Sequence, residues 1–322
     1  MTDDARWMAA AARLAARARP ASNPNPAVAC LIAKDGILLA RGWTQRGGRP
    51  HAEAHALAQL APGAAQGATI YVTLEPCAHA SPRGPACADV LAEAKPARVV
   101  IGTVDPDPRT SGKGIARLEA AGIAVTLLDD PDARASLAGF LARQTKNRPF
   151  VTLKLAMSAD GFIARPPGEE QWITGEAARA HVHARRARQD AILVGGGTWR
   201  TDAPRLDVRL PGLEAHTPRR IVLTRGAAPA GTSAIATPQA IGELEGVQYL
   251  YVEGGAATAA AFLDAGLVDR IDLYRAPVVF GAGTRAPAGL MPGQLDDVSG
   301  PWHKVEQCQL GSDTFAAYQR RS

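Results

Sequence analysis

The sequence contains few aromatic residues and no concentrated charge. Phe, Trp and Tyr make up 5% of its 322 residues, whereas single-stranded nucleic-acid binders usually combine aromatic stacking residues with clustered Lys and Arg. The net charge of +5 comes from 36 basic and 31 acidic residues spread along the chain, and the longest basic cluster is HARRAR at 183–188. We therefore expect small anionic ligands and no nucleic-acid partner.

Long apolar runs and a cysteine framework are also missing. No segment approaches the roughly 18 apolar residues that cross a membrane, and the acidic start MTDDARWMAA differs from a secretory signal. We expect a cytoplasmic protein with no membrane partner. Four cysteines are too few for a disulfide scaffold, and in a reducing compartment paired cysteines near a histidine indicate a metal site first. Cys30 and Cys308 are expected to be small buried hydrophobic residues.

The length and the order of patterns indicate two α/β domains. A chain of this size exceeds what one core usually supports, and strands alternating with helices restart after the polar segment 143–149, which has the character of a linker. We place the domains at 1–146 and 147–322. In the first we expect strands at 27–33, 37–43, 69–74, 97–104 and 123–128, and helices at 3–19, 51–61, 85–94, 114–122 and 132–145. In the second we expect strands at 150–158, 190–197, 219–224, 247–255 and 268–279, and helices at 175–188 and 256–266.

Residues able to bind a metal concentrate between HAEAHALAQL (51–60) and TLEPCAHASPRGPAC (73–87). One imidazole, from His51, and two thiolates, from Cys77 and Cys87, suit a tetrahedral zinc that keeps one position for water. Such a water ionises near neutral pH. Glu53 can take its proton and pass it to a leaving amine, as in zinc deaminases. His55 is expected to act in packing or behind the ligands, because a zincin has its Glu directly after the first His.

Two other interpretations stay open at this point. Nine residues separate Cys77 from Cys87, whereas nucleoside and nucleic-acid deaminases have two between their cysteines. The chain could still be a nucleoside or tRNA deaminase with an appended nucleotide-binding domain. It could also contain a structural zinc module without catalysis, although such sites usually have four protein ligands. Glu75 is expected to be structural.

The segment PCAHASPRGPAC resembles the deaminase half of the bifunctional deaminase/reductase family of riboflavin biosynthesis, as do NPNPAVAC and DPDPRTSGKG. The chain departs from the family by one extra residue before Arg83, by Ala29 for Gly and by Asp107 for Asn. The resemblance implies a cytidine-deaminase-like three-layer domain. It also implies substrate contacts from Arg83 on the phosphate side, from Asp105 at the polar ring edge, and from Asn25 and His79.

The segments LKLAMSADGFIA, QWITG, VGGGTWRTDAPRLDVR and VEGGAATAAAFLDAGLVDRI resemble the reductase half of that family. The resemblance implies a dihydrofolate-reductase-like α/β domain that uses NADPH. It implies cofactor contacts from Ala156, Trp172, Thr198, Asp202, Gly255, Ala256, Ala257 and Thr258. It implies substrate contacts from Lys154, Glu170, Arg186, Leu206, Arg209 and Glu253.

Two arginines of this set suit a phosphorylated substrate. The guanidinium groups of Arg186 and Arg209 can form paired hydrogen bonds with a phosphate. Glu170 stands where the family commonly has Ser, and an added carboxylate near a phosphate is unfavourable unless it is paired. The segment HVHARRAR (181–188) is expected to form a solvated helix face and not an RNA-binding face.

The resemblance implies two consecutive reactions. The first domain would deaminate 2,5-diamino-6-(5-phosphoribosylamino)pyrimidin-4(3H)-one with zinc, and the second would reduce the ribosyl group to ribityl with NADPH. The preference for NADPH over NADH is inherited from the family. We also expect a homo-oligomer.

Overall fold

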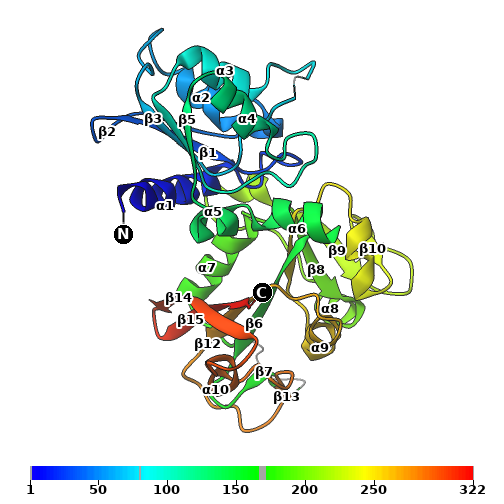
Figure 1. The fold of residues 1–322 in the computed structure, drawn as a ribbon. Helices are drawn as coiled ribbons and strands as arrows, with labels where there is room; N and C mark the ends of the chain where they lie inside the picture. The colour runs from blue at the N-terminus through cyan, green and yellow to red at the C-terminus, as the bar shows by residue number, and fades with distance from the viewer. Residues whose placement is uncertain (1, 80, 167–171, 322) are drawn as a thin grey trace. The chain divides into compact units, whose positions relative to one another are not determined.

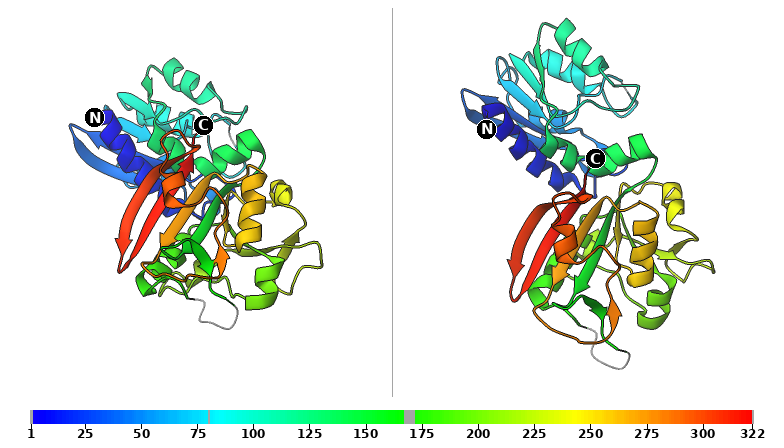
Figure 2. Two further views of the ribbon diagram at one scale, coloured as in Figure 1. Left: turned by 90° about the horizontal axis from the view of Figure 1, so that it is seen from below. Right: turned by 60° about the horizontal axis from the view of Figure 1, so that its bottom comes forward.

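The computed structural model describes residues 2–79, 81–166 and 172–321. The chain divides into two compact units, Met1–Arg148 and Pro149–Ser322 (Figures 1 and 2). Helix α6 (Ala138–Lys146) ends shortly before strand β6 (Phe150–Met157) begins. The expectation that 143–146 form part of a linker is therefore wrong. These four residues continue α6, which ends where Asn147 adopts the left-handed conformation with φ +51°.

The first unit is built on a five-stranded sheet in the order β2-β1-β3-β4-β5. Strand β1 pairs antiparallel with β2 and β3, whereas β3, β4 and β5 are parallel to one another. The strands are β1 (Ala29–Lys34), β2 (Ile37–Trp43), β3 (Thr69–Val72), β4 (Arg98–Ile101) and β5 (Ala124–Leu127). The helices are α1 (Asp3–Ala15), α2 (Ala52–Leu57), α3 (Cys87–Ala94), α4 (Lys113–Ala120), α5 (Pro131–Ser136) and α6, with 3-10 turns η1 (Ala16–Ala18) and η2 (Arg46–Gly48).

Helices cover both faces of this sheet, which gives three layers. Alternating side chains of β1 separate the two cores, because successive residues of a strand point to opposite faces. Leu31 packs with Met8 of α1 and Ala133 of α5. Ile32 packs in the opposite core, with Leu91 of α3 and residues of α2 and α4. The expected three-layer arrangement is confirmed.

The second unit is built on an eight-stranded sheet in the order β10-β9-β8-β11-β6-β12-β15-β14. The strands from β10 to β12 in this order are parallel, and β15 and β14 add an antiparallel edge. The strands are β6, β8 (Ala191–Gly195), β9 (Arg219–Leu223), β10 (Ser233–Ile235), β11 (Tyr249–Val252), β12 (Arg270–Arg275), β14 (Trp302–Leu310) and β15 (Asp313–Arg320), with β7 (Phe162–Ala164) and β13 (Thr284–Arg285) in a separate pair. The helices are α7 (Glu176–Arg186), α8 (Gly196–Asp202), α9 (Ala256–Asp264) and α10 (Pro292–Leu295), with 3-10 turns η3 (Glu214–His216) and η4 (Pro238–Glu243).

Two helices cover opposite faces of this sheet. Phe262 of α9 packs in the main core with side chains of β6, β8 and β11. Val182 of α7 packs on the other face with Tyr274 of β12 and Phe315 of β15. The α/β class expected for this half is confirmed. The hairpin β14–β15 and helix α8 were not among the expected elements.

Two further expectations concern the burial of two cysteines and the presence of membrane-spanning helices. Cys30 is buried in β1 as expected, but the expectation for Cys308 is wrong, because its thiol is exposed on β14 at the edge of the sheet. No helix within the described ranges is long and apolar enough to cross a membrane.

Candidate active sites

The expected metal ligands converge in the first unit. His51 immediately precedes α2, Cys77 follows β3, and Cys87 is the first residue of α3. The Nδ1 atom of His51 lies 3.2 Å from the Cys87 Sγ and 3.6 Å from the Cys77 Sγ, and the three potential ligand atoms lie within 4.8 Å of one another. One imidazole and two sulfurs at this spacing fit a zinc ion that has three protein ligands.

Backbone contacts hold these ligands in place. The Cys87 N–H donates a hydrogen bond to the Cys77 Sγ at 3.2 Å. The interaction with Cys87, together with His51, lowers the pKa of the Cys77 thiol. The side-chain amide of Asn25 lies 3.3 Å from the Nε2 of His51, on the ring edge opposite the sulfurs. The Cys77 thiol is therefore prepared for the deprotonation that metal binding requires, whereas the interaction with Cys77 and burial raise the pKa of the Cys87 thiol.

Glu53 is placed as a buried carboxylate beside this cluster. It is 3% exposed in the first turn of α2, two residues after His51. Burial raises its pKa, and the charge of His51 opposes that change. A carboxyl group with a raised pKa is suited to accept and release a proton near neutral pH.

Most of the other residues predicted for the deaminase line one cavity of about 380 Å³ with His51 and Glu53. Asn25, His79, Arg83 and Asp105 all contribute to its wall. Burial raises the pKa of Asp105 to about 6, while the N–H of Asp107 donates a hydrogen bond to its Oδ1 at 2.9 Å. The cavity therefore combines a metal-binding set with polar groups that suit a pyrimidine.

His55 and Glu75 have structural roles, as expected. The Nδ1 of His55 accepts the backbone N–H of Trp43 at 3.3 Å and lies 2.9 Å from the Gln45 amide. The Glu75 carboxylate accepts backbone N–H groups at the start of α4, from Gly112 and Gly114 at 3.1 and 2.9 Å. Neither side chain belongs to the metal-ligand set found among the described residues.

A second cavity, of about 260 Å³, lies in the other unit. It is lined by seven of the residues predicted for the reductase, which come from β6, the segment before α7, α7 itself and the segments that follow β8 and β11: Lys154, Ala156, Trp172, Arg186, Arg209, Glu253 and Gly255. Predicted residues that do not line it are Thr198, Asp202, Leu206, Ala256, Ala257 and Thr258. Glu170 lies outside the described residues.

Lys154, Arg186 and Glu253 form a charged cluster within the lining of this cavity. The Arg186 Nε and Nη2 donate hydrogen bonds to the two carboxylate oxygens of Glu253 at 2.6 and 2.8 Å, and the Lys154 Nζ lies 3.8 Å from Glu253 Oε2. Burial alone would raise the pKa of Glu253, but the charge and hydrogen bonds of Arg186 lower it. Burial lowers the pKa of Lys154.

Arg186 and Arg209 were both expected to bind phosphate, but their contacts differ. The Arg186 Nη1 donates to the backbone carbonyl of Asp207 at 3.0 Å, so all three of its nitrogens have protein acceptors. Arg209 has a side chain that is 49% exposed and an Nε that lies 3.3 Å from the Asp207 Oδ1. Arg209 thus keeps room for a phosphate, whereas Arg186 organises Glu253. The solvated face expected for 181–188 is also wrong, because Arg185 and Arg186 side chains are only 18% and 12% exposed.

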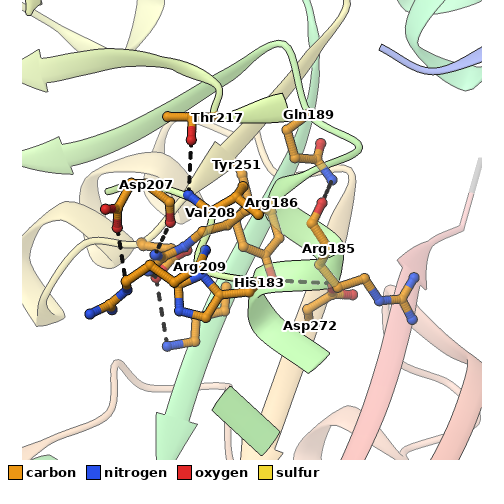
Figure 3. Close-up of polar contacts among 12 residues, drawn as sticks. His183, Arg185, Arg186, Gln189, Asp207, Val208, Arg209, Thr217, Tyr251 and Asp272 are labelled. Atoms are coloured by element: carbon orange, nitrogen blue, oxygen red, sulfur yellow. Dashed lines mark hydrogen bonds and ion pairs between the residues drawn. The ribbon is translucent and has the colours of Figure 1, made fainter. Parts of the chain in front are cut away.

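Contacts from three segments fix the loop that carries Arg209. The Arg209 N–H donates to the Nδ1 of His183 at 3.2 Å, and the Val208 N–H donates to the Thr217 Oγ1 at 3.0 Å (Figure 3). Leu206, with φ +53°, is buried in an apolar cluster with Tyr251. Leu206 therefore anchors this loop in the apolar core and does not line the cavity.

Glycine turns at neighbouring strand ends fit a dinucleotide phosphate. Strands β8 and β11 pair in parallel, so the turns after them lie at the same edge of the sheet. A Cβ at Gly195 or Gly254 would lie 2.2 or 2.4 Å from atoms of Thr258, so only glycine allows this close packing. Gly255 immediately precedes α9 and provides no side-chain cap, which leaves the first N–H groups of the helix available to an anion. These residues fit NADPH.

Several cavity residues were missed by the sequence interpretation. Arg49 and Arg109 line the first cavity, and Arg179 and His183 line the second. Arg179 lies with its guanidinium carbon 5.0 Å from the centre of the Trp172 ring. The four missed residues have only a weak signal in the sequence, because single basic residues outside a motif are usually exposed to solvent.

Comparisons with known proteins follow the same division of the chain. A family described as "Cytidine and deoxycytidylate deaminase zinc-binding region" matches residues 1–103, and one described as "RibD C-terminal domain" matches 149–241 and 239–314. The riboflavin biosynthesis protein RibD of Escherichia coli is 36% identical over 360 aligned residues that cover 96% of this chain and 97% of that protein. The RibD of Corynebacterium ammoniagenes is 41% identical and covers 82% and 83%.

Solved structures give the same result. RibD of Acinetobacter baumannii matches with a TM-score of 0.83 and 33% identity over 99% of both chains. A protein of Thermotoga maritima, described as a diaminohydroxyphosphoribosylaminopyrimidine deaminase/5-amino-6-(5-phosphoribosylamino)uracil reductase, matches with a TM-score of 0.83 and 29% identity over 99% of both chains.

The fold and the two cavities define a two-domain enzyme, in which a zinc-dependent deaminase is followed by an NADP-dependent reductase. The chain belongs to the RibD family of bifunctional riboflavin biosynthesis proteins. The predicted family, fold class, activities and cofactors are thereby confirmed.

Proposed function

We propose that the first unit deaminates 2,5-diamino-6-(5-phosphoribosylamino)pyrimidin-4(3H)-one at the carbon that bears the 2-amino group. The observation that carries this proposal is the buried Glu53 carboxylate beside the His51, Cys77 and Cys87 cluster, in a cavity that also contains Asp105 and Arg83. Asp105 accepts hydrogen bonds from the polar ring edge. Arg83 lies on the phosphate side.

His51, Cys77 and Cys87 hold the zinc in this proposal. When bound, zinc lowers the pKa of a coordinated water to near 7 and so supplies the nucleophile. Glu53 accepts a proton from the attacking water and delivers it to the departing amino group, which leaves as ammonia. The burial of Glu53 supports this role, because it raises the pKa of the carboxyl group.

We propose that the second unit reduces the ribosyl group of the deaminated product to ribityl, giving 5-amino-6-(5-phosphoribitylamino)uracil. NADPH supplies the hydride when bound at the glycine turns that contain Gly255, with Thr198 and Trp172 beside them. Glu253 and Lys154 hydrogen-bond the sugar hydroxyls, and Arg186 holds Glu253 in place. Arg209 receives the phosphate, because its guanidinium is half exposed at the cavity.

A two-step assay on the full chain tests the deaminase assignment. We expect E53Q to abolish ammonia release from the diaminopyrimidine phosphate, because Gln cannot carry the proton. NADPH oxidation on the deaminated intermediate should continue at the wild-type rate. The control is E93Q, at an exposed position of α3, which should keep both activities. Normal deamination by E53Q would refute the proposed proton transfer.

We infer that the chain forms a homo-oligomer. Strand β2 is an edge of the first sheet and exposes three consecutive apolar side chains, Ile37, Leu38 and Leu39, at 65, 41 and 37%. Exposed apolar residues on the edge strand of a sheet are typical of a surface that binds another chain. Light scattering after size exclusion should give a mass of at least twice 33.6 kDa, and a monomer would contradict this inference.

A further inference from the structure

Two guanidinium groups at the deaminase cavity have no carboxylate partner among the residues that the structure describes. Arg49 and Arg83 both line the cavity, and each has a backbone carbonyl as its side-chain acceptor. Arg109 differs, because its Nε and Nη2 contact the Asp107 carboxylate at 3.0 and 2.5 Å. The positive charge of Arg109 is thus balanced, whereas the charges of Arg49 and Arg83 are left for a ligand.

The Arg49 and Arg83 side chains each contact the chain segment that carries the other arginine. The Arg83 Nη2 donates to the carbonyl of Gly47 at 2.6 Å, and the Arg49 Nη1 donates to the carbonyl of Pro85 at 3.4 Å. A guanidinium has five N–H donors. One contact each therefore fixes the position of these groups and leaves donors for an anion.

Gly84 shows how closely Arg49 approaches the cysteine loop. This residue has φ +143°, a conformation that favours glycine, and a Cβ there would lie 2.8 Å from the Arg49 Nη1. The contacts of Arg49 with Pro85 and of Arg83 with Gly47 therefore join the segment before His51 to the strand-to-helix segment that supplies the third metal ligand.

Arg49 and Arg83 are close in sequence to two of the metal ligands. Arg49 precedes His51 by two residues, and Arg83 precedes Cys87 by four. A phosphate held by both would therefore be held at a fixed distance from the metal ligands. Two guanidinium groups suit a phosphate monoester, because each can form paired charge-assisted hydrogen bonds with its oxygens.

We propose that Arg49 is a further specificity-determining residue of the deaminase, which binds the phosphate monoester of the substrate beside Arg83. This proposal rests on the proposed function of the first unit, in which Arg83 already lies on the phosphate side. In this role Arg49 strengthens binding of the phosphorylated substrate and leaves binding of its dephosphorylated form unchanged.

The test compares two substrates on the full zinc-loaded protein. Initial rates of ammonia release are measured with the diaminopyrimidine phosphate and with its dephosphorylated form for wild type, R49Q, R49K and R83Q. One charge-assisted contact corresponds to about 1.5–3 kcal/mol, or roughly a 10- to 150-fold change. We expect R49Q to raise KM for the phosphate by about that factor with kcat within about twofold, and to leave the dephosphorylated substrate unchanged. R49K should restore part of the loss.

R46Q is the matched control, because Arg46 lies in η2 three residues before Arg49 and does not line the cavity. It should behave as wild type. Equal effects of R49Q on both substrates, or wild-type behaviour of R49Q, would overturn this role of Arg49. Failure of the wild-type protein to release ammonia from either substrate would count against the proposed function itself. Zinc content and NADPH oxidation on the deaminated intermediate show whether each variant is folded.

Discussion

Removal of the Glu253 charge should destabilise the second unit strongly. Glu253 and Arg186 side chains are 8% and 12% exposed, and they share two hydrogen bonds of 2.6 and 2.8 Å. In E253Q, the guanidinium of Arg186 stays charged and buried, whereas Lys154 can lose its proton. Loss of one partner of a buried ion pair costs about 3–5 kcal/mol, which corresponds to a fall in Tm of about 6–20 °C for a domain of this size.

The assay is hydrogen exchange of the amides in β6, β8 and β11 of the full chain, because these strands are neighbours in the sheet. The control is E306Q, since Glu306 also contacts two arginines, Arg185 and Arg270, but has a side chain that is 41% exposed. It should cost no more than about 1 kcal/mol. Equal losses in the two variants would refute the reasoning that burial decides the cost.

The pH dependence of this effect has a definite sign. The pKa of Glu253 in the folded chain is lowered from 4.5, mainly by Arg186 acting against burial. Its contribution to stability is therefore present above pH 4.5 and is lost as the pH falls through the lowered pKa. The difference between wild type and E253Q should shrink correspondingly in acid.

Two other predictions concern the first unit. Burial raises the pKa of Asp105 to about 6, and the ionised form is the one that accepts hydrogen bonds from the substrate. KM for deamination should therefore double at about pH 6 and rise roughly tenfold by about pH 5. D105N should have a higher KM that does not change with pH in this range. A pH-independent wild-type KM would contradict this role. Removal of zinc by a chelator should abolish ammonia release and lower the stability of the first unit, while NADPH oxidation on the deaminated intermediate continues; equal loss of both activities would mean that the two units do not function separately.

The metal site could be predicted from the sequence because its residues occupy short motifs. His51, Glu53, Cys77 and Cys87 lie within 37 residues, and each lies next to a helix or strand whose pattern is clear. The pairing of Arg186 with Glu253 could not be predicted, since 67 residues separate them and only the sheet brings them together. Arg186 was therefore expected to bind phosphate, although its side chain pairs with the Glu253 carboxylate of the same chain.

The antiparallel hairpin at the end of the chain was missed for another reason. Most residues of β14 are exposed, so its sequence WHKVEQCQL has no apolar alternation that would indicate a strand. Cys308 was misplaced for the same reason, because a small apolar residue is buried only where the strand face it points to is covered, and β14 lies at the edge of the sheet with most of its residues exposed.

The buried carboxyl groups of the two cavities lie in different charge environments. In the second unit, the Glu253 carboxylate pairs with Arg186 and lies 3.8 Å from the Lys154 Nζ, so cationic side chains of the chain itself surround it. In the first unit, one imidazole faces two thiols and the Glu53 carboxyl, and no Lys or Arg within the described ranges forms an ion pair with Glu53. A divalent cation that converts the thiols to thiolates balances this set. Zinc is therefore expected to act as part of the folded first unit, whereas the Glu253 carboxylate of the second unit has its cationic partners in the chain itself.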